Sequence, residues 1–84
     1  METTYGMRLT LSRTACKIAA KEGWTAEQIL ETFNSPKAIY ENKKYAGQYR
    51  IAGTEIVIVG VPMDEERFHG ITLIVNGSEA PVKA

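Results

Sequence analysis

The apolar residues after position 12 recur at helical spacing. Over residues 13–22 they stand three and four apart, the pattern of an amphipathic helix whose core-facing side chains are Ala15, Cys16, Ile18 and Ala19. Ser12 stands where an N-cap belongs, and Gly23 follows the last periodic residue, where a left-handed C-cap is common. The pattern predicts a first helix over residues 13–22.

A second helix is predicted to begin after Thr25 and to end before Pro36. Thr25 and Gln28 stand three residues apart, as the two partners of a capping box do. Trp24 precedes the cap and Ile29 follows it at the fourth helical position, and these are the two positions of a hydrophobic staple. Proline disfavours the α conformation of the residue before it, so the helix is expected to stop near residue 34.

Beyond Pro36 the apolar period changes from helical to two, which indicates strands. The predicted strands are residues 38–40, 48–52, 55–61 and 68–75. The segment 55–61 reads EIVIVGV and is apolar on both faces. We therefore expect it to be a central strand with cover on each side.

The predicted fold class is α+β, with two N-terminal helices packed on a four-stranded antiparallel sheet. The links between the predicted strands are short, and short links favour antiparallel neighbours. The 84 residues allow one domain, with an ordered core over about residues 7–77 and a loose tail over 78–84. The alternation of Met7, Leu9 and Leu11 fits either a brief strand or the lead-in to the first helix.

Composition and charge exclude several classes of protein. Ten Lys and Arg balance ten Asp and Glu, so the chain is not a strongly basic nucleic-acid arm. No apolar run approaches the ~20 residues that span a bilayer, and the N-terminus lacks the apolar stretch of a signal peptide, so we expect a cytoplasmic protein outside the membrane. One cysteine and one histidine cannot make a Cys/His zinc site, and no glycine-rich phosphate loop is present, so neither metal nor cofactor is expected.

The densest candidate site is the segment 43–50, KKYAGQYR. Its chemically active side chains are Lys43, Lys44, Tyr45, Gln48, Tyr49 and Arg50. Phosphates pair with Lys and Arg and bases stack on aromatic rings, so this mixture suits a single-stranded nucleic acid. Strand alternation turns Tyr49 into the core and leaves Arg50 exposed. The alternative is a hairpin whose exposed lysines prevent edge-to-edge pairing of strands.

Basic residues are concentrated in the first part of the chain. Residues 1–50 hold eight basic and five acidic side chains, a balance of +3, whereas residues 51–84 hold two and five, a balance of −3. Arg13, Lys17 and Lys21 repeat every four residues on one face of the first helix. This stripe is a solvated helix surface unless it lies beside 43–50, where the two would form one anion-binding face.

His69 is the only imidazole in the chain, and imidazole is the side chain most often used for proton transfer near neutral pH. Strand alternation puts it on one face, together with Ile71, Leu73 and Val75. It puts Thr72 on the other face, together with Phe68 and Ile74. The position favours a structural role at the start of the strand, with general acid or base work as the alternative.

The chain as a whole resembles small bacterial and phage proteins with the RelE/barnase-like ribonuclease-toxin fold, above all short members from actinobacteria and their phages. Three stretches carry the likeness, LSRTACKIAAKEGWTAEQILETFNSP, YAGQYRIAGTEIVIVG and HGITLIV, and they span about residues 10–75. The resemblance implies a helix–helix–four-strand domain. It also implies an RNA-directed site, which is matched loosely by Arg13, Lys17, Tyr45 and Arg50.

Two functions follow from these residues and from the resemblance. The first is a small phage- or prophage-type binding protein that grips a host protein or RNA. Its expected contact residues are Arg13, Lys17, Lys43, Lys44 and Gln48. The alternative is a metal-independent endoribonuclease toxin of a toxin–antitoxin system, whose expected catalytic residues are Tyr45, Arg50 and His69. Related families commonly have a histidine in the first helix; the segment Arg13–Cys16 has none, which favours the binding protein.

The expected partners are a host protein or an antitoxin, RNA, or a second copy of the chain. Two helices can cover one face of a sheet, whereas the strand 55–61 is apolar on both. We therefore expect a dimer or a bound protein to cover the second face.

Overall fold

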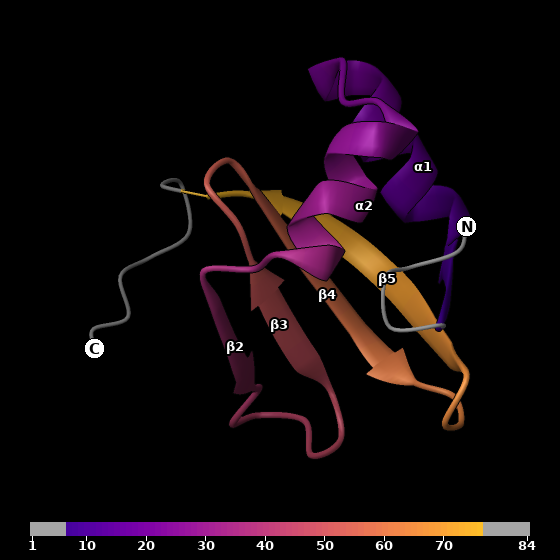
Figure 1. The fold of residues 1–84 in the computed structure, drawn as a ribbon, viewed down its shortest axis with the longest axis vertical. Coiled ribbons are helices and arrows are strands. Elements are labelled where there is room, and N and C mark those ends of the chain that lie inside the picture. The colour runs from indigo at the N-terminus through magenta and orange to yellow at the C-terminus, as the bar shows by residue number, and fades with distance from the viewer. Residues whose placement is uncertain (1–6, 77–84) are drawn as a thin grey trace.

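Five strands form one mixed sheet in the computed structural model, which describes residues 7–76 (Figure 1). The strands are β1 (Arg8–Leu11), β2 (Ala38–Glu41), β3 (Tyr49–Ala52), β4 (Ile56–Pro62) and β5 (Arg67–Val75). Their order across the sheet is β1-β5-β4-β3-β2, so β4 is the central strand, as predicted. The predicted core end at residue 77 and the predicted loose tail over 78–84 lie outside the described residues.

The prediction of a four-stranded antiparallel sheet is wrong, because the segment before the first helix adds a fifth strand. β1 pairs with β5 in parallel, and the other three pairings are antiparallel. Leu9 stands opposite Phe68, and both side chains are buried. Strand formation therefore places the alternating apolar residues of this segment in the core, which the lead-in to a helix would not do.

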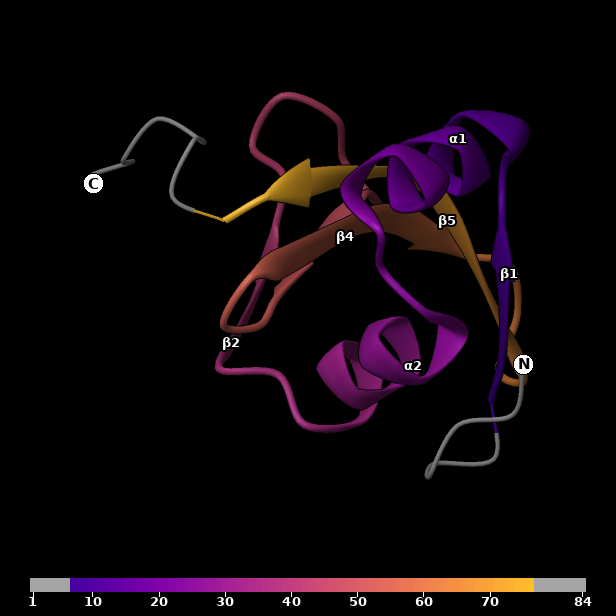
Figure 2. The same cartoon turned by 90° about the horizontal axis from the view of Figure 1, so that it is seen from above.

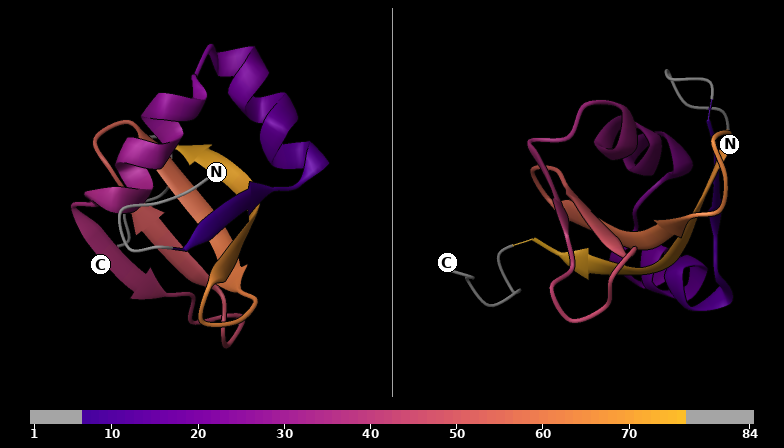
Figure 3. Two further views of the ribbon diagram at one scale, coloured as in Figure 1. Left: turned by 45° about the vertical axis from the view of Figure 1, so that its right-hand side comes forward. Right: turned by 90° about the horizontal axis from the view of Figure 1, so that it is seen from below.

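The first helix, α1 (Arg13–Glu22), has the predicted bounds and caps. The side chain of Ser12 accepts the backbone N–H of Ala15, and Gly23 closes the helix with a left-handed φ of 77°. The helix packs chiefly against β5 and continues along the edge of that strand where β1 stops (Figures 1 and 3). Ala15 and Ala19 face the core, but Cys16 is exposed, so the prediction that Cys16 faces the core is wrong.

The second helix, α2 (Ala26–Asn34), lies over one face of β3 and β4. Its predicted capping box is present, with Thr25 and Gln28 bonded to each other's backbone N–H groups at 2.8 and 3.1 Å. Phe33 of α2 packs on Phe68 with ring centroids 5.3 Å apart. Both helices and the inner face of the sheet share one core, which also holds Trp24, Ile29, Ile51, Ile56, Ile58 and Leu73.

The sheet face away from α2 carries a second, smaller apolar cluster. Ala52, Val57 and Val59 form it, with Ile74 packed against them, and neither helix contributes a residue. Val57 is fully buried and Val59 is 5% exposed within the single chain. These outer-face side chains are thus buried within the single chain, and the expected dimer or bound protein over the second face stays a prediction.

A β-bulge reverses the alternation of β5 near its middle. Val59 pairs with Thr72 and Gly60 pairs with Gly70, so Ile71 has no partner on β4. Alternation therefore restarts at Ile71, and the bulge puts His69 and Thr72 on the same face. The predicted grouping of His69 with Leu73 and Val75, and of Thr72 with Phe68, is wrong for this reason, because Phe68, Leu73 and Val75 all pack into the main core.

Candidate functional site

The β2–β3 loop, residues 42–48, is held in shape by its own hydrogen bonds. The side chain of Asn42 donates to the side-chain oxygen of Gln48 at 2.7 Å, and the backbone N–H of Asn42 donates to the carbonyl of Gln48 at 2.7 Å. Lys44 N–H donates to the Asn42 side chain, and Gly47 N–H donates to Glu41. Gly47 has a φ of 83°, a conformation that favours glycine. The loop is therefore a preformed turn.

The tip of this loop exposes three of the residues that the sequence predicts to act on a ligand, whereas Gln48 is half-buried. Lys43 and Lys44 are exposed, and Tyr45 has an exposed fraction of 54%. The Nζ atom of Lys44 lies 5.8 Å from the centre of the Tyr45 ring, which is within cation–π range. Figures 2 and 3 show the loop curving toward the side of the sheet away from α2.

Arg50 lies on the same side of the sheet as this loop. It lies on β3 between Tyr40 of β2 and Val59 of β4. Strand alternation places these three positions on the sheet face that α2 does not cover. Tyr49 points into the main core, as predicted. Arg50 is half-buried, however, whereas the alternation predicted an exposed side chain.

His69 shares this sheet face with Arg50. It pairs with Val61 on β4 and with Thr10 on β1, and the Thr10 hydroxyl lies 2.8 Å from Nδ1 of its ring. Arg50 and His69 are two strands and two residues apart, so ordinary sheet spacings put their Cα atoms about 12 Å apart.

The basic stripe of α1 and the basic loop lie at opposite edges of the sheet. Arg13, Lys17 and Lys21 are exposed on α1, which runs beside β5, whereas residues 42–48 join β2 and β3. The predicted single face that joins Arg13 and Lys17 to Arg50 is therefore not formed by neighbouring elements. The predicted site residues separate into a group at the loop and the outer sheet face, and a second group on α1.

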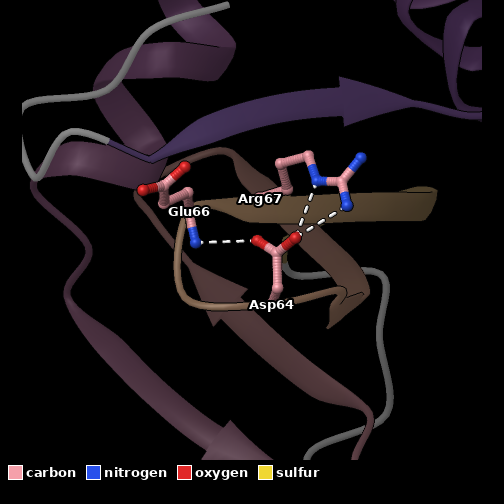
Figure 4. A network of polar contacts seen from close by, with 3 residues as sticks. All are labelled: Asp64, Glu66 and Arg67. Atoms are coloured by element: carbon pink, nitrogen blue, oxygen red, sulfur yellow. Dashed lines mark hydrogen bonds and ion pairs between the residues drawn. The ribbon is translucent and has the colours of Figure 1, made fainter.

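The β4–β5 turn contains an ion pair that engages a further arginine of this face (Figure 4). Asp64 accepts two hydrogen bonds from the guanidinium of Arg67, at 2.7 and 2.9 Å, and one from the backbone N–H of Glu66. The bond from Arg67 is the main reason that the pKa of the Asp64 carboxyl falls below its ordinary value, and the pKa of Arg67 is raised in return. These hydrogen bonds therefore hold the acidic β4–β5 turn in a defined conformation.

Three side chains that organise this region were not among the predicted site residues. Asn42 and Glu41 hold the loop, and Thr10 holds His69. Only Asn42 has a signal in the sequence, because asparagine commonly bonds the backbone two residues ahead of it in a turn. Glu41 acts six residues away and Thr10 acts across 59 residues, and no local pattern identifies such partners.

The described residues offer no metal centre and no membrane span. In residues 7–76, no three His, Cys, Asp or Glu side chains gather closely enough to hold a metal ion. Neither described helix is long and apolar enough to cross a membrane. A hollow between α2 and the β3–β4 turn is lined by polar groups, including Glu31, Thr32 and Glu55, and by none of the predicted site residues.

Comparisons with known proteins give no relative for this chain. No protein-family model matches it, and neither a curated protein nor a solved structure is significantly similar to it.

Proposed function

We propose that this protein binds single-stranded RNA with the β2–β3 loop and the adjoining outer face of the sheet. One observation carries the proposal: the loop 42–48 is fixed by internal hydrogen bonds and presents two lysines and one tyrosine to solvent. Lysines neutralise phosphates and an exposed ring stacks on a base, and these are the two interactions that single-stranded RNA requires.

The rigidity of the loop supports binding because it lowers the entropic cost of association. A flexible lysine-rich loop loses conformational freedom when it grips a ligand, whereas this turn is already closed by Asn42, Glu41 and Gln48. Arg50, on the strand that follows, extends the cationic surface along the sheet face toward His69. The site is local, which is compatible with a net charge of zero for the whole chain.

A titration of fluorescent single-stranded RNA at two salt concentrations tests this function. Lys43→Glu combined with Lys44→Glu is expected to abolish binding at low salt. The control is Lys21→Glu, which reverses a charge on the last turn of α1 and should leave binding within about twofold of the wild type. No binding by the wild type at low salt would end the proposal and leave a protein target as the better hypothesis.

The salt dependence of the wild type gives a second measure. Each phosphate contact on a single strand contributes about 0.7 to the slope of log K against log salt. Contacts by Lys43, Lys44 and Arg50 predict a slope of about 2, again from 0.7 per contact. The double variant Arg13→Glu with Lys17→Glu shows whether the α1 stripe also contacts RNA. A smaller slope in this variant than in the wild type would mean that the stripe makes phosphate contacts.

Endoribonuclease activity is the second candidate, and the position of His69 is the observation that favours it. Its ring is held by the Thr10 hydroxyl and lies on the sheet face that carries Arg50, so a proton-transfer group and a phosphate-binding cation share one surface. Cleavage of RNA in the presence of a chelator, and its loss in His69→Ala with binding retained, would establish the enzyme. Binding without cleavage leaves the binding protein.

A further inference from the structure

Tyr40 is an exposed aromatic residue on the outer face of the sheet, the face that α2 does not cover. It lies on β2 opposite Arg50 of β3 and has an exposed fraction of 42%. The residue two positions before it, Ala38, and its diagonal neighbour on β3, Ala52, each carry only a methyl group as side chain. These two positions therefore leave room beside the Tyr40 ring for a flat ligand.

Two side-chain amides, those of Asn42 and Gln48, lie on the other side of Tyr40. The backbone N–H of Asn42 donates to the carbonyl of Gln48, so the β2–β3 ladder continues by one pair beyond the ends of both strands. Strand alternation puts both amides on the outer face, since Tyr49 between Gln48 and Arg50 points into the core. Gln48 is thus the diagonal neighbour of Tyr40, and diagonal neighbours lie about 7–8 Å apart, within reach of each other's side chains.

The backbone determines which atoms of these two amides stay available to a ligand. The backbone N–H of Lys44 donates to Asn42 at 2.9 Å, and only the side-chain oxygen of Asn42 can accept it. The side-chain nitrogen of Asn42 therefore faces Gln48 and donates to its oxygen, Oε1, at 2.7 Å. The nitrogen of Gln48, Nε2, remains, and its two N–H groups donate to no other group of residues 7–76. The amide pair thus offers hydrogen-bond donors beside the Tyr40 ring.

Gln48 also connects this part of the sheet to the loop tip. Its backbone N–H donates to the carbonyl of Tyr45 at 3.1 Å, so Gln48 adjoins Tyr45 in the loop as well as Tyr40 on the sheet. Both tyrosine rings are exposed. An RNA strand that stacks one base on Tyr45 can therefore place another base on Tyr40, with the amide of Gln48 beside it.

We propose that Tyr40 and Gln48 form a base-binding subsite that prefers uracil to cytosine. This inference rests on the proposed RNA binding and names the base that the site selects. The Tyr40 ring stacks on the base, and stacking by itself tolerates any base. The Gln48 amide selects, because uracil has a carbonyl oxygen on both sides of its pairing edge and meets Nε2 with an acceptor in either orientation. Cytosine has a carbonyl oxygen on one side only and an amino group, which is itself a donor, on the other.

Titration of fluorescent oligouridine at low salt tests the stacking residue. Tyr40→Ala is expected to weaken binding by about 5- to 150-fold, the range for one base–aromatic stack, and Tyr40→Phe should bind like the wild type. Ile39→Ala is the matched control, because Ile39 is the preceding residue of the same strand, is more exposed at 59%, and lies on the other sheet face. It should bind like the wild type. Equal binding by Tyr40→Ala and Ile39→Ala overturns the subsite.

Gln48→Glu tests the selection of the base. The carboxylate keeps an oxygen for the Asn42 amide and replaces the two donors by an acceptor. Its negative charge weakens binding to every RNA alike, so the quantity measured is the ratio of the affinities for oligouridine and for oligocytidine of equal length. The wild type should favour oligouridine by about two- to tenfold, the value of one hydrogen bond, and Gln48→Glu should remove or reverse this preference. An unchanged ratio, or a wild type that favours oligocytidine, overturns the proposal.

The double variant Lys43→Glu with Lys44→Glu separates a failure of this subsite from a failure of the proposed function. Binding that the double variant loses and Tyr40→Ala fully retains would support the RNA site and overturn the subsite alone. A wild type that binds neither oligouridine nor oligocytidine at low salt overturns both.

Discussion

The hydroxyl of Ser12 donates a hydrogen bond to the carbonyl oxygen of Ile71, the bulged residue of β5. The same hydroxyl accepts the backbone N–H of Ala15 at 3.1 Å, and the backbone N–H of Ser12 donates to the carbonyl of Gly70 at 2.8 Å. Ser12 thus ends β1, begins α1 and attaches both to β5. The bulge exposes the carbonyl of Ile71 at the point where β1 gives way to α1.

Ser12→Ala is expected to lower the free energy of unfolding by about 1–2 kcal/mol. The substitution removes the N-cap of α1 and leaves the carbonyl of Ile71 without this donor. Urea denaturation measures the difference. Thr14→Ala is the matched control, since Thr14 is exposed on the same helix and its loss should change stability by about 0.5 kcal/mol at most. Equal effects of the two substitutions would contradict the role of Ser12.

Gly60→Ala is expected to be among the most damaging single-methyl additions in the chain. A β-carbon at Gly60 would overlap the carbonyl oxygen of His69 and lie 2.7 Å from the Phe68 ring, so the bulge would have to rearrange. Gly23→Ala provides the comparison, because that position has open space but a left-handed φ and should cost about 1–2 kcal/mol. The melting temperature of Gly60→Ala should be well below that of Gly23→Ala, and the reverse order would contradict the bulge geometry.

Ile58→Ala is expected to cost about 2–5 kcal/mol, the range for a fully buried aliphatic side chain. Ile58 lies on the central strand and faces the main core, so its removal leaves a cavity beneath α2. Met63→Ala, at an exposed apolar position, should change the free energy of unfolding by about 0.5 kcal/mol or less. Comparable losses in denaturation curves of the two variants would contradict the central placement of β4.

The elements that the sequence predicts well are those with local signals. The two helices have caps, periodicity and a stop at Pro36 within a few residues of each other, and their observed bounds agree with the pattern. The two apolar faces of β4 predict a central strand, and the strand order confirms this. β1 had only three alternating residues, and its partner lies about sixty residues away, so nothing local could specify its parallel pairing with β5.

The bulge explains why strand alternation failed at the end of the chain. In a regular strand, the sheet face of each residue follows from that of its neighbour. The extra residue Ile71 breaks this alternation, so residues before the bulge are predicted on the wrong face relative to residues after it. Strict alternation therefore groups His69 with core residues, whereas the structure places it on the outer face with Arg50. The sequence carries a weak sign of the bulge, since Gly60 and Gly70 stand opposite each other beside it.

The candidate site divides in the same way into local and distant parts. The sequence identified Lys43, Lys44 and Tyr45 because they are adjacent, and the loop does present them together. It could not show that the stripe of Arg13 and Lys17 lies at the opposite edge, because that depends on the strand order of the whole sheet. Proximity in the sequence was a good guide to proximity in space only inside one hairpin.

The ion pair between Asp64 and Arg67 is expected to make the stability of the protein depend on pH in the acid range. The pKa of Asp64 is lower in the folded state than in the unfolded state. The stabilisation of the folded state by this ion pair is therefore fully present above the unfolded pKa of about 3.9, and it is lost as the pH falls through the folded pKa. The pair is exposed, so the effect on melting temperature should be small. The melting temperatures of the wild type and of Asp64→Asn should differ at neutral pH and become equal in acid. A difference that stays constant down to pH ~2 would exclude the ion pair as its cause.

Tyr45 distinguishes RNA binding from RNA cleavage. If its exposed ring stacks on a base, Tyr45→Ala should weaken binding by about 5- to 150-fold, the range for one base–aromatic stack, and Tyr45→Phe should bind like the wild type. If its hydroxyl instead transfers a proton, Tyr45→Phe should bind RNA normally but lose cleavage.

Met63→Ala is the control for Tyr45, since it removes a similarly exposed apolar side chain from the other hairpin. It should leave both binding and cleavage unchanged. Fluorescence titration and a chelator-treated cleavage assay on the same RNA separate the outcomes. Binding that survives Tyr45→Ala would remove the ring from the site and leave Lys43 and Lys44 as phosphate contacts without a stacking platform.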